Sequence, residues 1–184
     1  MIEILDAVLE ALRTGPKAFS APVLDSKTSD VEPDGSPPPR AGNFYISVME
    51  NGTRSVGDAA QFALEEVHRV VVFVSIRIAA TPQDRYDVIL RRNTKGMKVL
   101  ERQVLRAVHG QQWIRSRANA IALAAGNMGV GDQGYLTPLY FEGRSQYAVR
   151  GADWSSETNS SLGWVVAQLP FVGMRRIQYL DSIT

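Results

Sequence analysis

The first apolar pattern along the chain has the period of an α-helix. Its apolar side chains recur with the i, i+3, i+4, i+7 spacing of one helix face, and Glu3, Asp6 and Glu10 take the other side. Gly15-Pro16 follows, and these residue types end helices. The pattern predicts a short amphipathic helix over 2–13, with an apolar face made of Ile2, Leu5, Val8, Leu9 and Leu12.

Residues 20–42 form a segment of a different kind, with five prolines among serine, aspartate and glycine. Proline breaks a helix interior and cannot donate to a strand ladder, so we expect a loop or an extended arm. A loop of this length is unusual inside a compact domain. Two interpretations stay open: a disordered insertion, or an arm that orders against a neighbouring chain.

Two stretches then alternate with the two-residue period of a β-strand. In the first, 43–49, every second side chain from Phe44 is apolar. Asn51-Gly52 follows, and this dipeptide is typical of a type I′ hairpin turn. The sequence therefore predicts a strand that ends at a tight turn.

The second stretch, 67–78, is the clearest strand in the sequence. Its even positions are apolar from residue 70 onward, and we expect them to face the core. Its odd positions are mixed, because Val71 and Phe73 lie between Arg69 and Arg77. An antiparallel sheet with one face that is wet or covered by a partner has this pattern.

A long helix is expected next. Thr81-Pro82-Gln83-Asp84 offers an N-cap, a proline for the first helical position and an acidic residue three positions after the cap. We expect the helix to run from there to about Val108, with Gly96 marking a close crossing with the sheet or a kink. Its expected buried stripe consists of Tyr86, Ile89, Leu90, Met97, Leu100, Val104 and Val108.

We interpret 110–138 as a glycine-containing extended loop region, in which 111–126 could hold a short helix and 126–138 is a mobile or strained loop. Strand-like segments follow, joined in part by a polar turn at 155–161. The whole chain, 1–184, is therefore expected to be a single α+β domain: a mostly antiparallel sheet with a long helix packed on one face, an N-terminal helix and a proline-rich arm. The expected C-terminal strands are 139–142, 146–154, 162–169 and 171–180.

Charge is unevenly distributed along the chain, although 20 basic residues nearly balance 19 acidic ones. Residues 1–66 hold 5 basic and 11 acidic residues, a net charge of −6. Residues 67–120 hold 11 basic and 3 acidic residues, or +8, and residues 121–184 hold 4 and 5, or −1. Such asymmetry marks a nucleic-acid surface or complementary faces between subunits, or else an arginine-rich solvated helix face.

Composition excludes several kinds of chemistry. The chain has no cysteine and only two histidines, so disulfides, thiolate chemistry and multi-histidine metal sites are excluded. We assign structural roles to His68, on the core side of a strand, and to His109, at a helix C-terminus. Gly129-Val130-Gly131 has the spacing of a dinucleotide loop, but no helix-forming sequence follows it. We expect no cofactor and find no argument for an enzyme.

No stretch approaches 18 uncharged apolar residues, and acids stand at the N-terminus where a signal peptide needs a basic start. We therefore expect a soluble protein made in the cytoplasm.

The order of elements resembles the tail terminator, or tail completion, proteins of tailed bacteriophages. The most similar passage runs from residues 67–74 (VHRVVVFV) through 80–87 (ATPQDRYD) into the long helix. The similarity covers most of the chain in element order. Segments 20–42 and 110–138 look like additions to the compact members of that family.

This resemblance implies a structural virion protein of the tail or neck. Such proteins form a homohexameric ring that caps the tail tube, stops its polymerisation and meets the head connector or stopper protein, with DNA passing through the channel without sequence specificity. The implied partners are therefore other copies of the chain, the tail tube protein, the connector and DNA. The candidate subunit or DNA-lumen contacts are Arg69, Val71, Phe73, Arg77, Arg91, Arg92, Lys95, Lys98, Arg102 and Arg106.

Two alternatives stay open. One is a basic nucleic-acid-binding module that uses the cations of the long helix together with Arg115 and Arg117, although no recognisable reader module is present. The other is a different neck or tail component.

Overall fold

Two strands of 16 residues, β2 (Ala63–Ile78) and β6 (Gly163–Gln178), pair along their whole length and form the centre of an antiparallel sheet. The structure is a computed structural model and describes residues 3–18, 44–58, 63–78, 96–128, 133–150 and 163–178. Strand β1 (Phe44–Asp58) pairs with β2 on one side. Three short strands pair with β6 on the other side: β3 (Gly134–Tyr135), β4 (Tyr140–Phe141) and β5 (Gln146–Arg150).

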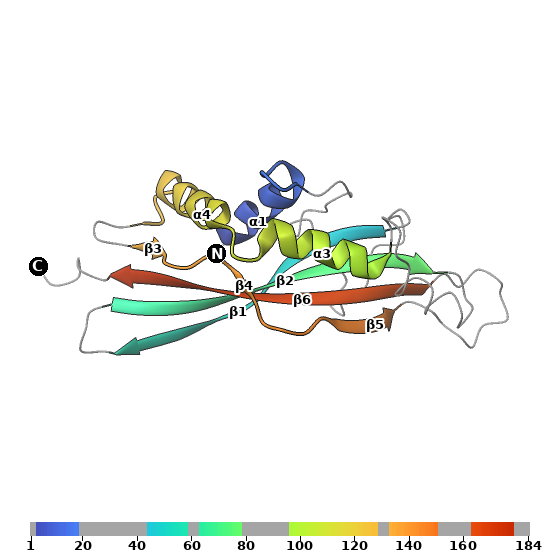
Figure 1. Cartoon of the computed structure of the whole chain (residues 1–184). Helices are drawn as coiled ribbons and strands as arrows, with labels where there is room; N and C mark the ends of the chain where they lie inside the picture. Colours follow the sequence, from blue (N-terminus) through green and yellow to red (C-terminus); the bar gives the residue numbers. More distant parts are fainter. Residues whose placement is uncertain are drawn as a thin grey trace, which may run out of the picture.

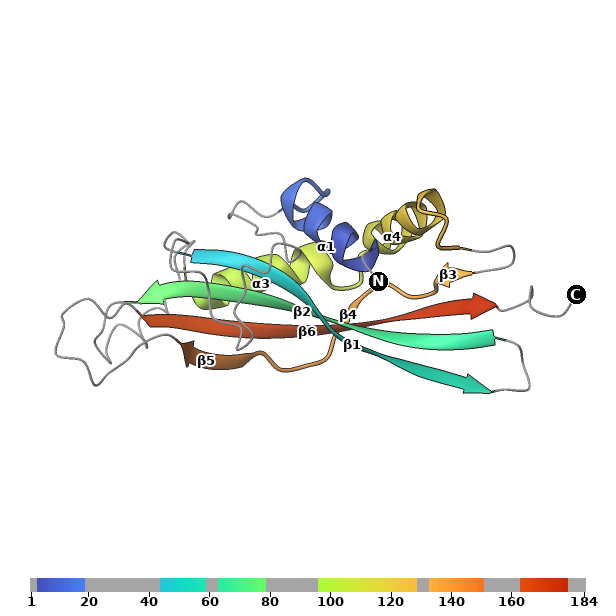
Figure 2. The same cartoon turned by 180° about the vertical axis from the view of Figure 1, so that it is seen from behind.

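The helices lie on one side of this twisted sheet, as Figures 1 and 2 show. They are α1 (Glu3–Arg13), α3 (Met97–Val108) and α4 (Gln112–Ala124), and α1 contacts both of the others. The expected α+β class with a mostly antiparallel sheet is therefore confirmed.

The core lies between the helices and one sheet face. Val70, Val72 and Val74 of β2 are fully buried in it, as the alternation of the sequence predicts. Leu12 of α1 and Leu100 of α3 are buried in the same cluster. Burial of apolar side chains at about 25 cal/mol per Å² is the main stabilising contribution of such a layer.

The prediction of a tight turn at Asn51-Gly52 is wrong. β1 continues through these residues to Asp58, and its register against β2 shifts between Glu50 and Thr53, which is a β-bulge. Gly52 has a φ of +92°, a conformation that costs glycine little and other residues much. The dipeptide that favours a tight turn therefore supplies an irregularity within a long strand.

The prediction of two separate strands, 162–169 and 171–180, is also wrong, because the single strand β6 continues through Pro170 without interruption. The carbonyl of Pro170 accepts the Glu142 N–H at 2.9 Å, so this edge of the residue faces the side of β3, β4 and β5. There β4 ends at Phe141 and β5 begins at Gln146. The missing proline N–H therefore falls in the gap between two short strands, where no ladder bond is lost.

The helix expected over 82–108 is described only from Met97. Gly96 is its N-cap, with extended dihedral angles (φ −79°, ψ 146°), so no helix runs unbroken through this glycine. Residues 79–95, with the expected N-cap at Thr81, lie outside the described residues.

The region 110–138 is more regular than the expected extended loop, because it contains α4 and β3. The short helix expected at 111–126 is confirmed as Gln112–Ala124. The strands expected at 139–142 and 146–154 correspond to β4 and β5. The segment 20–42 and the turn 155–161 lie outside the described residues.

Candidate subunit and nucleic-acid contact surfaces

The sheet face opposite the helices carries the first group of candidate residues. Arg69, Val71 and Phe73 of β2 alternate with the core valines and therefore point to this face. Val71 and Phe73 are only 5% and 7% exposed in the single chain. Arg69 is 58% exposed and pairs with Glu142 at 3.3 Å. A partner on this face would therefore meet the arginine more than the two apolar side chains.

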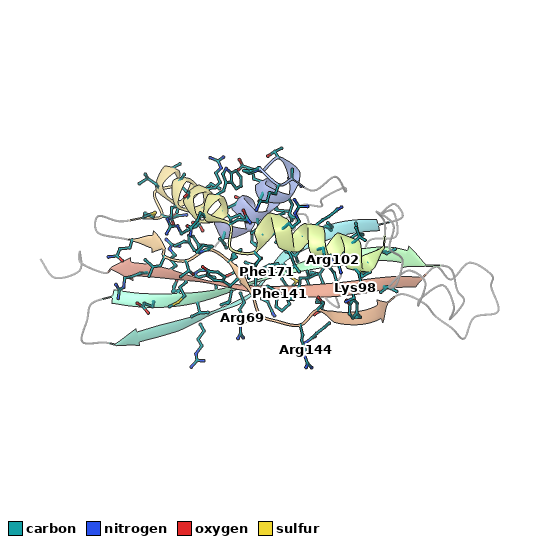
Figure 3. The ribbon with its side chains drawn as sticks, in the orientation of Figure 1. Arg69, Lys98, Arg102, Phe141, Arg144 and Phe171 are labelled. Atoms are coloured by element: carbon teal, nitrogen blue, oxygen red, sulfur yellow. The ribbon has the colours of Figure 1, made fainter. Side chains whose placement is uncertain are left out.

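Exposed side chains surround that buried centre. Met49 lies opposite Val71 in the β1–β2 register and is 40% exposed. Figure 3 shows Arg69 and Arg144 projecting away from the helices. Two arginines and the exposed Met49 side chain thus share the side of the sheet that no described helix covers.

A row of three cations follows α3. Lys98, Arg102 and Arg106 are spaced by four residues and therefore lie one above the other on the exposed side of the helix. Within the described ranges, neither Arg102 nor Arg106 has an acidic partner or a hydrogen bond. These two guanidinium groups are therefore available to an anionic ligand.

Lys98 differs from the other two, because it is engaged with its own chain. Its ammonium group pairs with Glu101 at 3.3 Å, donates to the hydroxyl of Tyr147 on β5, and lies 4.6 Å from the centre of that ring. The hydrogen bond to Tyr147 and the charge of Glu101 outweigh desolvation and raise the pKa of Lys98. Burial and the hydrogen bond with Glu101 raise the pKa of Tyr147. This cluster ties the start of α3 to β5.

The remaining candidates are not placed in a surface. Arg77 belongs to β2, but its side chain is outside the described part, and so are residues 91, 92 and 95 in full. Arg115 and Arg117 are described and serve the fold: Arg115 donates to the carbonyl of Leu136 at 3.2 Å. Arg117 pairs with Glu10 of α1 at 2.7 Å.

Sequence reasoning missed a buried polar cluster where α1, the end of α4, β3 and β6 meet. Glu3 is 4% exposed and accepts a hydrogen bond from the Asn127 amide at 2.6 Å. Arg175 of β6 is 6% exposed, donates to the Asn127 carbonyl at 2.7 Å, and lies 5.6 Å from the ring of Tyr135. No local pattern predicts this, because the contacting residues are far apart in sequence.

Burial works to raise the pKa of Glu3, but hydrogen bonds from its backbone amide and Asn127 and the charge of Arg175 outweigh it. The pKa of Glu3 is therefore lowered, so the carboxylate stays charged. Burial raises the pKa of the Tyr135 hydroxyl far above its usual value, so this group stays neutral.

His68 borders the same cluster and is fully buried, as its place on the core side of the strand predicts. Its Nε2 donates to Glu66 at 3.1 Å, which leaves Nδ1 as the unprotonated nitrogen, 4.0 Å from a Glu50 oxygen. The imidazole meets the Tyr135 ring edge-on at a centroid distance of 5.4 Å. Burial lowers the pKa of His68 more than the two glutamates raise it, so the ring is neutral.

Part of the acidic charge in the first third of the chain is balanced inside the fold. Glu10 pairs with Arg117, Glu65 pairs with Arg176 at 2.9 Å, and Glu3 lies in the field of Arg175. Acidic residues of the −6 segment are therefore partly neutralised within the chain by arginines of both later segments, and within the described residues Arg102 and Arg106 of α3 stay unpaired.

Among the described residues, no group of three or more His, Asp or Glu side chains could hold a metal ion. No helix in that part of the chain is long and apolar enough to cross a membrane. No family model matches the sequence, and no curated protein sequence is similar to it.

Proposed function

We propose that the chain is a structural subunit of a bacteriophage tail or neck, of the tail terminator type. In this proposal it forms a ring, a hexamer by the family resemblance, that caps the tail tube and joins it to the head connector. The observation that carries the proposal is the one-sided sheet, which has described helices on one face and Met49 and Arg69 exposed on the other.

The geometry supports assembly in two ways. A closed ring needs two different surfaces on each subunit, and the one-sided sheet and α3 supply two that differ in composition. β1 is also a 15-residue edge strand with no described partner on its outer side, and such edges pair readily with another chain. A segment 20–42 that reaches a neighbouring subunit belongs to this proposal.

DNA in the channel would require cations without sequence-specific contacts. Phosphate binding needs little more than accessible lysine and arginine side chains. Arg102 and Arg106 on α3, or Arg69 and Arg144 on the sheet side, would serve this role.

The test is assembly of the purified full chain, measured by light scattering and negative-stain imaging, alone and with tail tubes polymerised from the tube protein of the same phage. We expect rings, in solution or at one end of the tubes. Met49→Asp should weaken assembly by about ten-fold or more, because it buries a charge at the proposed interface. Leu123→Asp, at a 69% exposed site on α4, is the matched control and should leave assembly unchanged. Monomers at high concentration together with bare tubes would refute the proposal.

A basic nucleic-acid-binding module is the second candidate, because Arg102 and Arg106 are exposed and unpaired within the described residues. It would bind duplex DNA in the absence of any ring, and its affinity would fall steeply with salt.

A further inference from the structure

A groove with an apolar floor and cationic walls lies between the end of α1 and the exposed side of α3. One hollow, of 390 Å³, is lined by Lys17, Leu105, Arg106, His109, Gln111 and Phe141. A second hollow, of 260 Å³, is lined by Pro16, Lys17, Ala18, Gln103 and Arg106. Both hollows include Lys17 and Arg106, so these two side chains stand where the hollows adjoin.

The chain after α1 is held in place beside α3. The N–H groups of Thr14 and Gly15 both bind the carbonyl of Glu10, and the Ala18 N–H binds the carbonyl of Gly15. A Cβ on Gly15 would lie 2.7 Å from the Cα of Ala11, so only glycine lets the backbone fold back this closely. The position of Lys17 is therefore set by backbone hydrogen bonds.

The floor of the groove is the margin of the hydrophobic core. Leu105 and Phe141 are partly buried against the core, and the Phe141 ring packs on Phe171 at a centroid distance of 5.7 Å. His109 Nδ1 accepts the Phe141 N–H at 3.0 Å, and the Gln111 side chain donates to the His109 carbonyl at 3.2 Å. These hydrogen bonds hold His109 and Gln111 in place at the edge of the groove. An apolar side chain of a ligand could therefore pack on Leu105 and Phe141.

The charge of the groove is positive. Lys17 and Arg106 are exposed, and neither has an ion pair or hydrogen bond with another described residue. Among the described residues, no acidic side chain lines either hollow. A ligand that carries both carboxylates and an apolar group would therefore contact the cationic walls and the apolar floor together. An arginine binds a carboxylate through two parallel hydrogen bonds.

We propose that this groove binds an acidic peptide segment of a partner protein, with an apolar side chain seated over Leu105 and Phe141 and carboxylates at Lys17 and Arg106. A nucleic-acid backbone would use the cations but leave the apolar floor without a contact, so the observations favour a peptide. The proposal stands on the groove alone and does not depend on ring formation.

The probe is a fluorescent hexapeptide of four aspartates and two leucines, titrated with the full-length protein at low and physiological salt and followed by anisotropy. Lys17→Glu and Arg106→Glu should each weaken binding by about ten-fold or more, because each turns a charge-assisted contact into a repulsion. Replacing both leucines of the peptide by serine should weaken binding about as much, because the apolar contact is lost. Arg144→Glu, an exposed arginine on the other side of the sheet, is the control and should leave the affinity unchanged.

Several results would overturn the proposal. They are no binding at low salt, equal binding of the serine peptide, or an equal effect of Arg144→Glu, which would show attraction to net charge alone. Displacement of the peptide by duplex DNA at equal charge would assign the groove to nucleic acid. A change in light-scattering mass on Lys17→Glu, with no peptide binding, would assign it to a second copy of the chain. Circular dichroism of each variant establishes that it is folded, and ring imaging on the same samples tests the proposed function separately.

Discussion

Charged side chains serve opposite purposes at two places in this molecule. Where α1, α4 and β6 meet, Glu3 and Arg175 are almost fully buried and joined through Asn127. Along α3, Arg102 and Arg106 are exposed and have no partner within the described ranges. The first set holds elements together, whereas the second is free to meet another molecule.

This difference changes the meaning of the charge asymmetry along the chain. A −6 segment beside a +8 segment suggests a molecule with one acidic and one basic side. In the fold, acids of the first segment are balanced by arginines from both later segments, as Glu10–Arg117 and Glu65–Arg176 show. The cations left over, rather than the difference between segments, mark the surfaces for partners.

The strongest test of this comparison replaces one arginine in the buried cluster and one arginine on the exposed side of α3. Arg175→Leu should lower the free energy of unfolding by about 3 kcal/mol, because it leaves the buried Glu3 carboxylate without its nearby cation. Arg102→Leu should change it by less than about 0.5 kcal/mol, because an exposed unpaired arginine contributes little to the fold. Urea unfolding followed by circular dichroism measures both.

Equal losses in the two variants would contradict the comparison, and so would a stable Arg175→Leu protein. A further variant, Glu3→Gln combined with Arg175→Leu, should recover part of the loss, because it removes the carboxylate left unpaired by the single change. No recovery would mean that the arginine acts through packing alone.

The sequence could predict the parts of the fold that rest on local patterns. The alternation of residues 70–76 placed one face of β2 in the core, and the 3.6-residue period located α1. The predictions failed where the contacts of a residue in the fold override its usual conformational preference. Asn51-Gly52 forms a bulge because β2 continues opposite it. Pro170 fits a central strand because on one side of it the neighbouring strands, β4 and β5, leave a gap.

The candidate surfaces were harder to predict than the elements. The spacing of Lys98, Arg102 and Arg106 gave a cationic row, but only the fold shows that Tyr147 and Glu101 engage the first of them. The groove at Lys17 joins residues from α1, α3 and β4. Sequence separation of this size leaves no local signal, so both the groove and the Glu3–Arg175 cluster required the structure.

A smaller effect, the pH dependence of stability, tests the buried polar cluster and the neighbouring His68. Because burial lowers the pKa of His68, the folded protein takes up a proton less readily than the unfolded chain, whose histidine has a pKa near 6.5. The free energy of unfolding should therefore be highest above this pH and should fall as the pH drops below it, with a slope of at most about 1.4 kcal/mol per pH unit for one proton. The groups facing the imidazole are Glu50, Glu66, Tyr135 and Arg175.

His68→Gln should remove this slope between pH 7.5 and 5.5, because glutamine does not titrate and can still donate to Glu66. Glu3→Gln should keep the slope in that range and change the profile only at more acidic pH. The lowered pKa of Glu3 gives stability that is present above the unfolded value of about 4.5 and is lost as the pH falls through the folded value. Urea midpoints measured across the pH range for the wild type and both variants separate the two groups. An unchanged slope in His68→Gln would show that the acid sensitivity of the fold arises elsewhere.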